Sequence, residues 1–215
     1  MSDPIPAQRE RQALCDLFEQ VGPDAPTLSG DWTTRDLAAH LIVRERRPDA
    51  AGGILIAALA GRTERVQADI AERPWTELVA EVRNGPPRWS PMRFEPADRA
   101  ANTIEFFVHH EDVRRARDEW TVRDLDPDTR NDLHRALKRM ARPLARSAEV
   151  GIVLDATDTG GTDPIVAKRA EPSGTICGPV GEIVLYIYGR RDQAEIELDG
   201  ADDTVAAIES ATFGI

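Results

Sequence analysis

The sequence predicts an α + α/β fold in which a helical bundle over residues 1–148 is followed by a small α/β domain over residues 149–215. Up to about residue 148, apolar residues recur at the three- and four-residue spacing that is typical of amphipathic helices. From "GIVLDAT" onward, β-branched residues dominate, and glycine, threonine and aspartate gather into turns. A chain of 215 residues is also long enough to bury the cores of one medium and one small domain.

The first part of the chain is expected to begin with two amphipathic helices. In "AQRERQALCDLFEQV" one stripe of the helix is apolar, and "GPDAP" ends the helix. The second helix is expected over "WTTRDLAAHLIVRERR", where Thr33 and Asp36 have the spacing of a capping box and Pro48 marks the end. Each of these helices thus has at least one of its ends marked in the sequence.

Four further helices and one loop complete the predicted bundle. The helices are expected over "GILIAALAGRTERVQADIAER", "WTELVAEVRNG", "ANTIEFFVHHEDVRRARDEW" and "DTRNDLHRALKRMARPLARS", the last with a kink at Pro143. Because glycine and proline mark turns, the intervening "GPPRWSPMRFEPADRA" is expected to be a loop.

The small α/β domain is expected to contain four short strands, which are "GIVLDAT", "DPIVAKRA", "GTICG" and "QAEIELDG". The segment "VGEIVLYIYGRR" is compatible with either state, because its β-branched residues favour a strand while its length and terminal glycine allow a helix. The segment "ADDTVAAIESATF" is expected to close the chain as a helix, with Asp202 or Asp203 near its N-cap.

The charge and composition argue against several classes of function. The chain has 27 basic and 38 acidic residues and a net charge of −11, whereas a binder of nucleic acid or of anionic membranes needs a basic face. Its two cysteines, Cys15 and Cys177, stand in unrelated contexts, which argues against disulfides and favours a reducing cytoplasm. The N-terminal "MSDPIPAQRERQ" lacks the apolar core of a signal peptide, and the longest apolar run, "GGILIAALAG", is too short to span a bilayer. We therefore expect a soluble cytoplasmic protein that binds neither nucleic acid nor membranes.

A polar stripe runs down the core-facing side of the helix that contains "EFFVHHEDVRRA". At about 100° per residue, Asn102, Glu105, His109 and Asp112 fall within one sector, which apolar residues flank on both sides. A carboxylate and an imidazole in a bundle core are costly unless they are paired. A hydrogen bond between Glu105 and His109 would satisfy both groups, and so would a shared metal ion.

His40 repeats this anomaly on the second helix, where it lies on an otherwise apolar face. If the two polar stripes meet, His40, Glu105 and His109 form the three-ligand set of a catalytic zinc site whose fourth position is open. We therefore predict a metal site from these three residues. His110 points about 100° away from His109 and is expected to face the rim or the second domain. His134 is expected on an exposed helix face and without a role.

Two segments resemble the mycothiol-dependent maleylpyruvate isomerase family, a branch of the DinB-like metalloproteins: "DWTTRDLAAHLIVRER" and, further along, "NTIEFFVHHEDVRR". That family has an N-terminal helical bundle holding a divalent metal, usually zinc, and its ligand pattern implies His40, Glu105 and His109 here. The segment "GEIVLYIYGRRDQAEIELDG" resembles part of the family's sterol-carrier-like C-terminal domain, which implies a helix over the ambiguous stretch. The resemblance covers most of the chain, and "RERRPDA" and "FFVHHEDVRRA" place the chain nearer to an actinobacterial subgroup than to the isomerase itself.

The resemblance implies a thiol-dependent reaction. Zinc would bind the sulfur of mycothiol as a thiolate, which could add to an activated alkene in a cis–trans isomerisation or displace a leaving group in a thiol S-transfer. Arg44 would either pair with a carboxylate of a small electrophilic substrate or form an ion pair within the bundle. Asn102 and Asp112 are candidates to hold the ligands through hydrogen bonds. Arg190 resembles an arginine of the C-terminal domain that could face the site, or it serves only to end a helix.

Two other functions remain open from the residues. One is a hydrolase that uses zinc-bound water, with Glu111 or Asp112 as the general base. The other is a non-catalytic protein in which the metal ties the bundle together and the second domain holds an apolar ligand. A thiol requirement would separate the isomerase from the hydrolase. The sequence leaves open the substrate, the identity of the metal beyond a divalent ion, and the oligomeric state.

Overall fold

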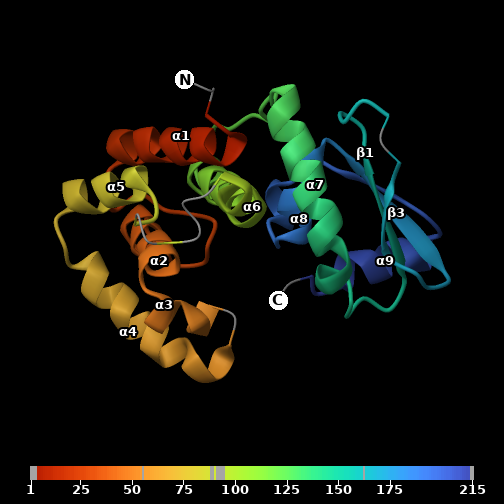
Figure 1. Cartoon of the computed structure of the whole chain (residues 1–215). Helices are drawn as coiled ribbons and strands as arrows, with labels where there is room; N and C mark the ends of the chain where they lie inside the picture. The colour runs from red at the N-terminus through yellow and green to blue at the C-terminus, as the bar shows by residue number, and fades with distance from the viewer. Residues whose placement is uncertain (1–3, 55, 88–89, 91–94, 162, 214–215) are drawn as a thin grey trace. The chain divides into compact units, whose positions relative to one another are not determined.

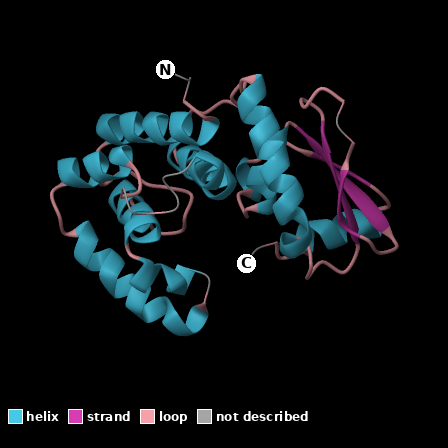
Figure 2. Ribbon diagram, in the orientation of Figure 1, coloured by secondary structure: helices cyan, strands magenta, loops and turns pink. Residues whose placement is uncertain are grey.

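The structure is a computed structural model that describes residues 4–54, 56–87, 90, 95–161 and 163–213 (Figure 1). It contains helices along its whole length and a four-stranded sheet in its C-terminal part (Figure 2). The prediction of a mixed chain, with helices first and strands afterwards, is confirmed. Among the described residues, no helix is long and apolar enough to cross a membrane.

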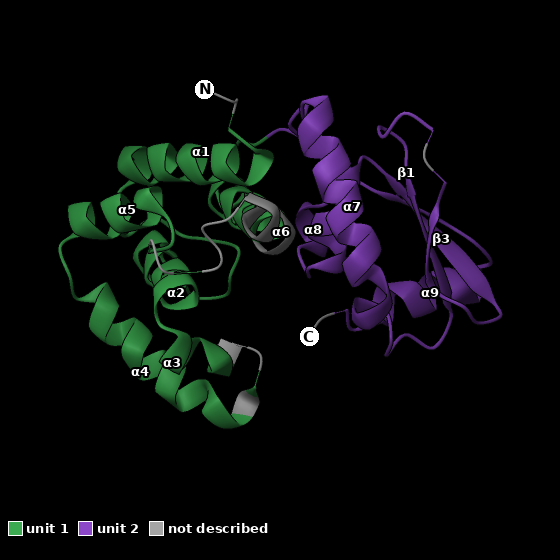
Figure 3. Cartoon of the chain, viewed as in Figure 1, with its two compact units in different colours: residues 1–120 green, residues 121–215 purple. Residues whose placement is uncertain are grey.

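The chain divides into two compact units, residues 1–120 and residues 121–215 (Figure 3). This division differs from the boundary expected near residue 148. The reason is helix α7 (Pro127–Leu144), which packs against strand β2 (Ile165–Lys168) and helix α8 (Val180–Ile187) and so belongs to the second unit. The amphipathic period of α7 reveals a buried face, but it does not reveal which core that face covers.

The first unit is helical, and its long helices enclose one apolar core. Its elements are α1 (Pro6–Val21), α2 (Thr34–Arg46), α3 (Pro48–Ala51), the 3₁₀ turns η1 (Gly52–Ile54) and η2 (Ala57–Leu59), α4 (Ala60–Ala71), α5 (Trp75–Asn84) and α6 (Glu95–Arg115). Helix α1 packs against α5 and α6, and α2 packs against α4 and α5. The side chains of Leu14, Phe18, Leu37 and Phe106 are fully buried between them. These contacts hold α2 and α6, which carry the candidate ligands.

The start of α2 is marked by the capping box that the sequence predicts. The backbone N–H of Asp36 donates to Thr33 Oγ1 at 3.4 Å, and the backbone N–H of Thr33 donates to Asp36 Oδ2 at 2.9 Å. These two bonds satisfy donors that the first turn of a helix leaves free. They fix the start of the helix on whose second turn His40 lies.

Two predicted boundaries in this unit are wrong. The helix expected over "GILIAALAGRTERVQADIAER" begins only at Ala60, because the chain before it folds back in tight turns. A side chain at Gly53 would collide with Thr63 and with the backbone of Leu59. The expected loop over residues 85–100 also ends earlier, since α6 begins at Glu95.

Helix α6 ends at Arg115, five residues before the expected end at Trp120. The chain turns there, and the indole of Trp120 lies 4.4 Å from the guanidinium carbon of Arg115. An arginine stacked on an indole in this way gains a cation–π attraction. The contact packs Trp120 against the last turn of α6.

The second unit is an α/β arrangement, and its four predicted strands are confirmed. Its further elements are β1 (Gly151–Ala156), β3 (Ser173–Gly178), the 3₁₀ turn η4 (Arg191–Gln193), β4 (Glu197–Asp199) and α9 (Asp202–Ser210). The strand order is β2-β1-β3-β4, with β1 and β3 parallel and the outer pairs antiparallel. The ambiguous segment is the helix α8, whose residues are all buried between α7 and strands β1 and β3.

The two cysteines are free, as expected. Cys15 is buried on α1, where its thiol lies 3.9 Å from the carbonyl oxygen of Val79. Burial raises the pKa of the Cys15 thiol to about 12. Because the thiolate is the reactive form, Cys15 is a core residue and not a nucleophile.

Candidate metal centre

Helices α2 and α6 bring His40, Glu105 and His109 together. One ligand atom from each of the three side chains lies within 4.8 Å of the other two. His40 Nε2 is 3.4 Å from Glu105 Oε1, and His109 Nε2 is 3.3 Å from the same oxygen. The two polar stripes that the sequence places on separate helices therefore meet.

The three side chains are mostly shielded from solvent. The exposed fraction of the side chain is 10% for His40, 11% for His109 and 23% for Glu105. The rings of the two histidines are 5.4 Å apart in an edge-to-face arrangement, and the ring of Trp32 lies 5.1 Å from that of His40. Trp32 is thus part of the wall around the site, although the sequence analysis assigned it no role.

Two of the three separations among the donor atoms fit a tetrahedral metal, and the third is within 4.8 Å. Two ligands at about 2.0–2.1 Å from a zinc ion in tetrahedral geometry are about 3.3 Å apart. The two nitrogen–oxygen separations of 3.3 and 3.4 Å match this value. Without metal, the same contacts serve as hydrogen bonds to Glu105 Oε1. The donor set, two imidazoles and one carboxylate, is also the type that zinc takes in catalytic sites.

Asp112 holds the ring of His109 from the other side. Its carboxylate is fully buried, and Asp112 Oδ2 lies 2.9 Å from His109 Nδ1. Ser29 Oγ donates to the same oxygen at 2.8 Å, and the backbone N–H of Leu28 donates to the carbonyl of Asp112. With Nδ1 occupied, the Nε2 atom of His109 is directed at the triad. A carboxylate that orients a ligand histidine in this way is a recurring feature of metal sites.

Arg44 and Asn102 form the opposite flank of the site. Arg44 Nε is 3.2 Å from Glu105 Oε1, and Arg44 Nη1 donates to Asn102 Oδ1. Asn102 Nδ2 donates to Glu45 Oε1 at 3.2 Å, and Arg11 holds that carboxylate through two bonds of 2.7 and 2.5 Å. The ion pair that the sequence left open for Arg44 therefore exists with Glu105. The sequence analysis did not identify the buried ion pair of Arg11 and Glu45. The only sign of it in the sequence is that both charged residues stand on apolar helix faces.

Charges at the site shift the pKa values of its groups in different directions. Burial raises the pKa of Glu105, but hydrogen bonds with His109 and His40 and the charge of Arg44 outweigh it and hold this pKa well below the ordinary range. Burial lowers the pKa of His40. Burial also disfavours the proton on His109, yet hydrogen bonds with Asp112 and Glu105 raise the pKa of His109 to about 9. In the absence of metal, His109 is thus the protonated member of the triad near neutral pH.

Two predictions for the remaining histidines are wrong. His110 is buried in the first unit, where its Nδ1 lies 2.8 Å from Glu10 Oε2 on helix α1. It does not lie at an exposed rim, because the packing of α1 against α6 covers it. His134 is also buried, with an exposed fraction of 9%. Helix α7, which carries it, packs against β2 and α8, and the periodicity of the helix did not reveal this burial.

Two further candidate residues, Glu111 and Arg190, are held by groups other than the three proposed ligands. Glu111 is fully buried and bonded to Arg114 and Arg115, with its Oε2 atom 2.5 Å from Arg115 Nε. Arg190 lies in the second unit just after α8, and its Nη1 donates to the carbonyl of Tyr188. This bond fits the alternative of a helix terminus, and the part of Arg190 in a reaction stays a prediction.

Comparison with known proteins found no matching family model, no matching curated protein and no matching solved structure.

Proposed function

We propose that this protein binds a divalent metal ion, with zinc as the preferred ion, through His40, Glu105 and His109. The observation that carries the proposal is the spacing of the three donor atoms together with the contact between His109 Nδ1 and Asp112 Oδ2. Without metal, the two imidazoles form a hydrogen-bonded cluster around Glu105 Oε1, and the set of two imidazoles and one carboxylate is the one that favours a metal. Three protein ligands leave the fourth position of a zinc ion for a substrate.

We further propose that the chain is a DinB-like metalloprotein related to mycothiol-dependent maleylpyruvate isomerases. Three features support this relationship: the three ligands stand at the positions of the family pattern, they come from two helices of a helical unit, and a small α/β unit follows. The activity would be an isomerisation or a thiol S-transfer on a small electrophile. The free cysteines favour a reducing cytoplasm as its compartment.

The residues around the triad have separate tasks in such a reaction. Bound zinc would make the thiolate of mycothiol available at neutral pH. Asp112 holds His109 in the tautomer that presents Nε2, and Ser29 holds Asp112. Arg44 stands beside Glu105 with a side chain that is 17% exposed, so its guanidinium can pair with a carboxylate of an anionic substrate. Asn102 fixes the direction of Arg44 by accepting a hydrogen bond from it.

The hydrolase alternative is weaker because both of its candidate general bases are engaged by other groups. A base must be within hydrogen-bond reach of the reacting water. Glu111 is occupied by two arginines, and the Asp112 carboxylate by His109 Nδ1 and Ser29. The contact of Asp112 is with Nδ1 of His109, whereas Nε2 is the nitrogen that faces the triad. The thiol reaction needs no such base, since the zinc-bound thiol gives up its proton on binding.

Metal content tests the site. Protein purified without a histidine tag and dialysed should retain about one equivalent of zinc. The His40→Ala and His109→Ala variants should lose it. His110→Gln and His134→Gln serve as matched controls and should keep it, with folding verified by circular dichroism. Full zinc content in the His40→Ala protein would overturn the proposed site.

Mycothiol binding tests the reaction class. Zinc-loaded protein should bind mycothiol and release about one proton per thiol near neutral pH, because free thiols have a pKa of about 8.5. Calorimetry in buffers of different ionisation enthalpy measures the number of protons. Glu105→Ala should bind no thiol if it has lost its metal. Equal binding to metal-free protein, or no binding to the loaded form, would leave a non-catalytic metal protein as the better interpretation.

A further inference from the structure

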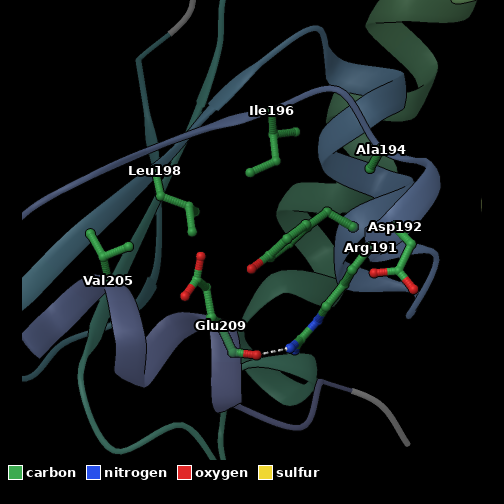
Figure 4. A pocket seen from close by; sticks show the side chains of 8 residues that line it. Arg191, Asp192, Ala194, Ile196, Leu198, Val205 and Glu209 are labelled. Carbon is green, nitrogen blue, oxygen red and sulfur yellow. Dashed lines mark hydrogen bonds between the residues drawn. The ribbon is translucent and has the colours of Figure 1, made fainter. Parts of the chain in front are cut away.

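The four-stranded sheet of the second unit has one covered and one open face. Because side chains alternate between the two faces of a strand, each face carries every second residue. Helices α8 and α9 pack on the face of Ile152, Leu154 and Ile176, which are buried. Figure 4 shows Ile196 and Leu198 directed into a pocket that α9 also lines, so they belong to the covered face as well.

The open face is acidic. All the residues that the register of the strands places on it in two rows are half-buried or exposed. The rows are Asp155, Cys177 and Glu197, and then Val153, Thr175 and Asp199. Burial and the charges of Asp155, Glu197 and Asp199 together raise the pKa of the Cys177 thiol, so the three carboxylates surround it. None of the three forms an ion pair with a residue that the structure describes.

A stripe of exposed cations, the basic stripe, follows helix α7. Between residues 133 and 148 the chain has five lysine and arginine residues and no acidic one, although its net charge is −11. They are Arg135, Lys138, Arg139, Arg142 and Arg146. The four on α7 are exposed and fall within a sector of about 100°, opposite the buried leucines of the helix. Arg135 pairs with Asp132, whereas the other three form no ion pair in the described part of the chain.

The helix dipole does not account for the basic stripe. Cations are favoured near the C-terminal end of a helix, but the effect falls off within the last turn. Of the four cations on α7, Arg142 alone lies in the last turn, and the others extend the stripe toward the middle of the helix. A row of exposed cations on an otherwise acidic chain indicates a surface for an acidic partner.

The basic stripe and the open sheet face match in the spacing of their charges. Lys138 and Arg142 are about one helical turn apart, which is a rise of about 6 Å. Glu197 and Asp199 are two residues apart on a strand, which is about 6.6–6.8 Å. The stripe lies on the helical side of the unit and the carboxylates lie on the other side of the sheet, so the two surfaces cannot pair within one copy. A second copy of the chain presents the fitting charges.

We propose that the basic stripe of α7 in one copy of the chain docks on the open sheet face of a second copy. The contact places a helix on the bare side of the sheet, which then has helices on both faces. It joins two different surfaces, so the association is head to tail and further copies can add. Four strands about 4.8 Å apart make a face about 19 Å wide, so the contact is at the small end of specific interfaces and is weak. The proposal does not depend on the metal site.

Sedimentation equilibrium of the full-length protein tests the association. At about 0.1 M salt the Debye length is about 10 Å, so direct ion pairs persist while the overall repulsion between acidic copies is screened. The mean mass of the wild type should rise with concentration. The double variant Glu197→Gln/Asp199→Asn should associate about tenfold more weakly, as expected for the loss of two surface ion pairs. A wild type that stays monomeric at all concentrations would overturn the proposal.

A control variant removes the same charge elsewhere. Asp69→Asn/Glu72→Gln changes two exposed acids at the end of α4, and each double variant changes the net charge from −11 to −9. If the overall charge alone mattered, both variants would associate more strongly than the wild type, because their copies repel each other less. We expect weaker association only in the variant of the sheet face. Equal behaviour of the two variants would contradict the proposed contact.

Lys138 allows the contact to be located. The chain has two lysines, and Nζ of the other, Lys168, is held by backbone carbonyls. A carbodiimide joins an amine to a carboxylate that it touches, and the reagent itself takes up the water that the new amide bond releases. In a mixture of unlabelled and isotope-labelled protein, mass spectrometry should find Lys138 of one copy joined to Asp155, Glu197 or Asp199 of the other. Crosslinks between copies that join Lys138 to carboxylates elsewhere, or an absence of such crosslinks, would overturn the proposal.

Discussion

Asp112 is the residue on which the proposed ligand geometry depends most. It is fully buried and bonds His109 Nδ1 and Ser29 Oγ through the same oxygen. We expect Asp112→Asn to weaken zinc binding by about 10- to 100-fold, as loss of such an orienting carboxylate does elsewhere. Competition with a chromophoric chelator measures the affinity.

The control for this variant is the neighbouring buried acid Glu111, which forms ion pairs with Arg114 and Arg115. Glu111→Gln should lose stability, because it removes the partner of two guanidinium groups, but its zinc affinity should stay within a few-fold of the wild type. An Asp112→Asn protein with wild-type affinity would show that packing alone orients His109.

The raised pKa of His109 predicts how the stability of the metal-free protein depends on pH. Its pKa in the folded protein is raised from 6.5 to about 9, so the folded state holds a proton that the unfolded chain releases. The resulting stabilisation is complete below pH 6.5 and is lost as the pH rises through about 9. In the presence of a chelator, the free energy of unfolding should therefore fall over this interval.

Urea unfolding at several pH values measures this effect. The His109→Gln protein has no such proton, so its free energy of unfolding should fall less between pH 6.5 and 9 than that of the wild type. Parallel curves for the two proteins would contradict the proposed charge state. Zinc must displace the same proton, so zinc affinity should increase with pH by about tenfold per unit below the His109 pKa.

At the scale of the element, the capping box of α2 holds the helix that supplies His40. Thr33 and Asp36 each accept a backbone N–H of the other. We expect Thr33→Ala to lower the free energy of unfolding by about 0.5–2 kcal/mol, the usual cost of losing an N-cap side chain. Thr76→Ala provides a control, since Thr76 is an exposed residue in the first turn of α5.

Urea titration of the two variants distinguishes capping from a general effect of removing threonine. The Thr76→Ala change should stay within about 0.5 kcal/mol of the wild type. Equal losses in both variants would mean that the capping box contributes nothing specific to α2. The zinc affinity of Thr33→Ala should stay near the wild-type value, because His40 lies on the second turn and is held by packing.

At the scale of the whole molecule, the division into two units predicts where a protease cuts first. The segment of residues 116–126 joins α6 to α7, and its residues are exposed or half-buried. Limited trypsin digestion should cleave first after Arg117 or Arg123, since exposed connections between compact units are preferred sites. Mass spectrometry of the early fragments identifies the cut.

If the boundary between the units lay near residue 148, the protease would cut there first. The contacts of the chain around this residue argue against such a cut. Ser147 Oγ donates to the carbonyl of Thr212, and Lys168 Nζ donates to the carbonyl of Ala148. The chain around residue 148 is thus tied to the second unit at both sides. A first cleavage between residues 145 and 150 would show that α7 separates from the second unit in solution.

Much of the fold and of the site was accessible from local patterns in the sequence. The capping box at Thr33, the four strands and the i,i+4 spacing of Glu105 and His109 all depend on residues close in the chain. Backbone geometry and side-chain direction act over these short distances, so a single segment is enough to reveal them. His40 could be added to the predicted set of ligands, because a histidine on an apolar helix face needs a buried partner.

Only the tertiary structure decided which distant groups became partners. His110 pairs with Glu10 on α1, His134 is buried, and α7 joins the second unit, none of which follows from the local pattern. Ser29 likewise acquired its surroundings from the packing of distant elements. The sequence period shows that a helix has a buried face, whereas the burial of a given side chain depends on the element that covers it. That choice is made by the packing of the whole core, where shape and hydrogen-bond satisfaction are settled together.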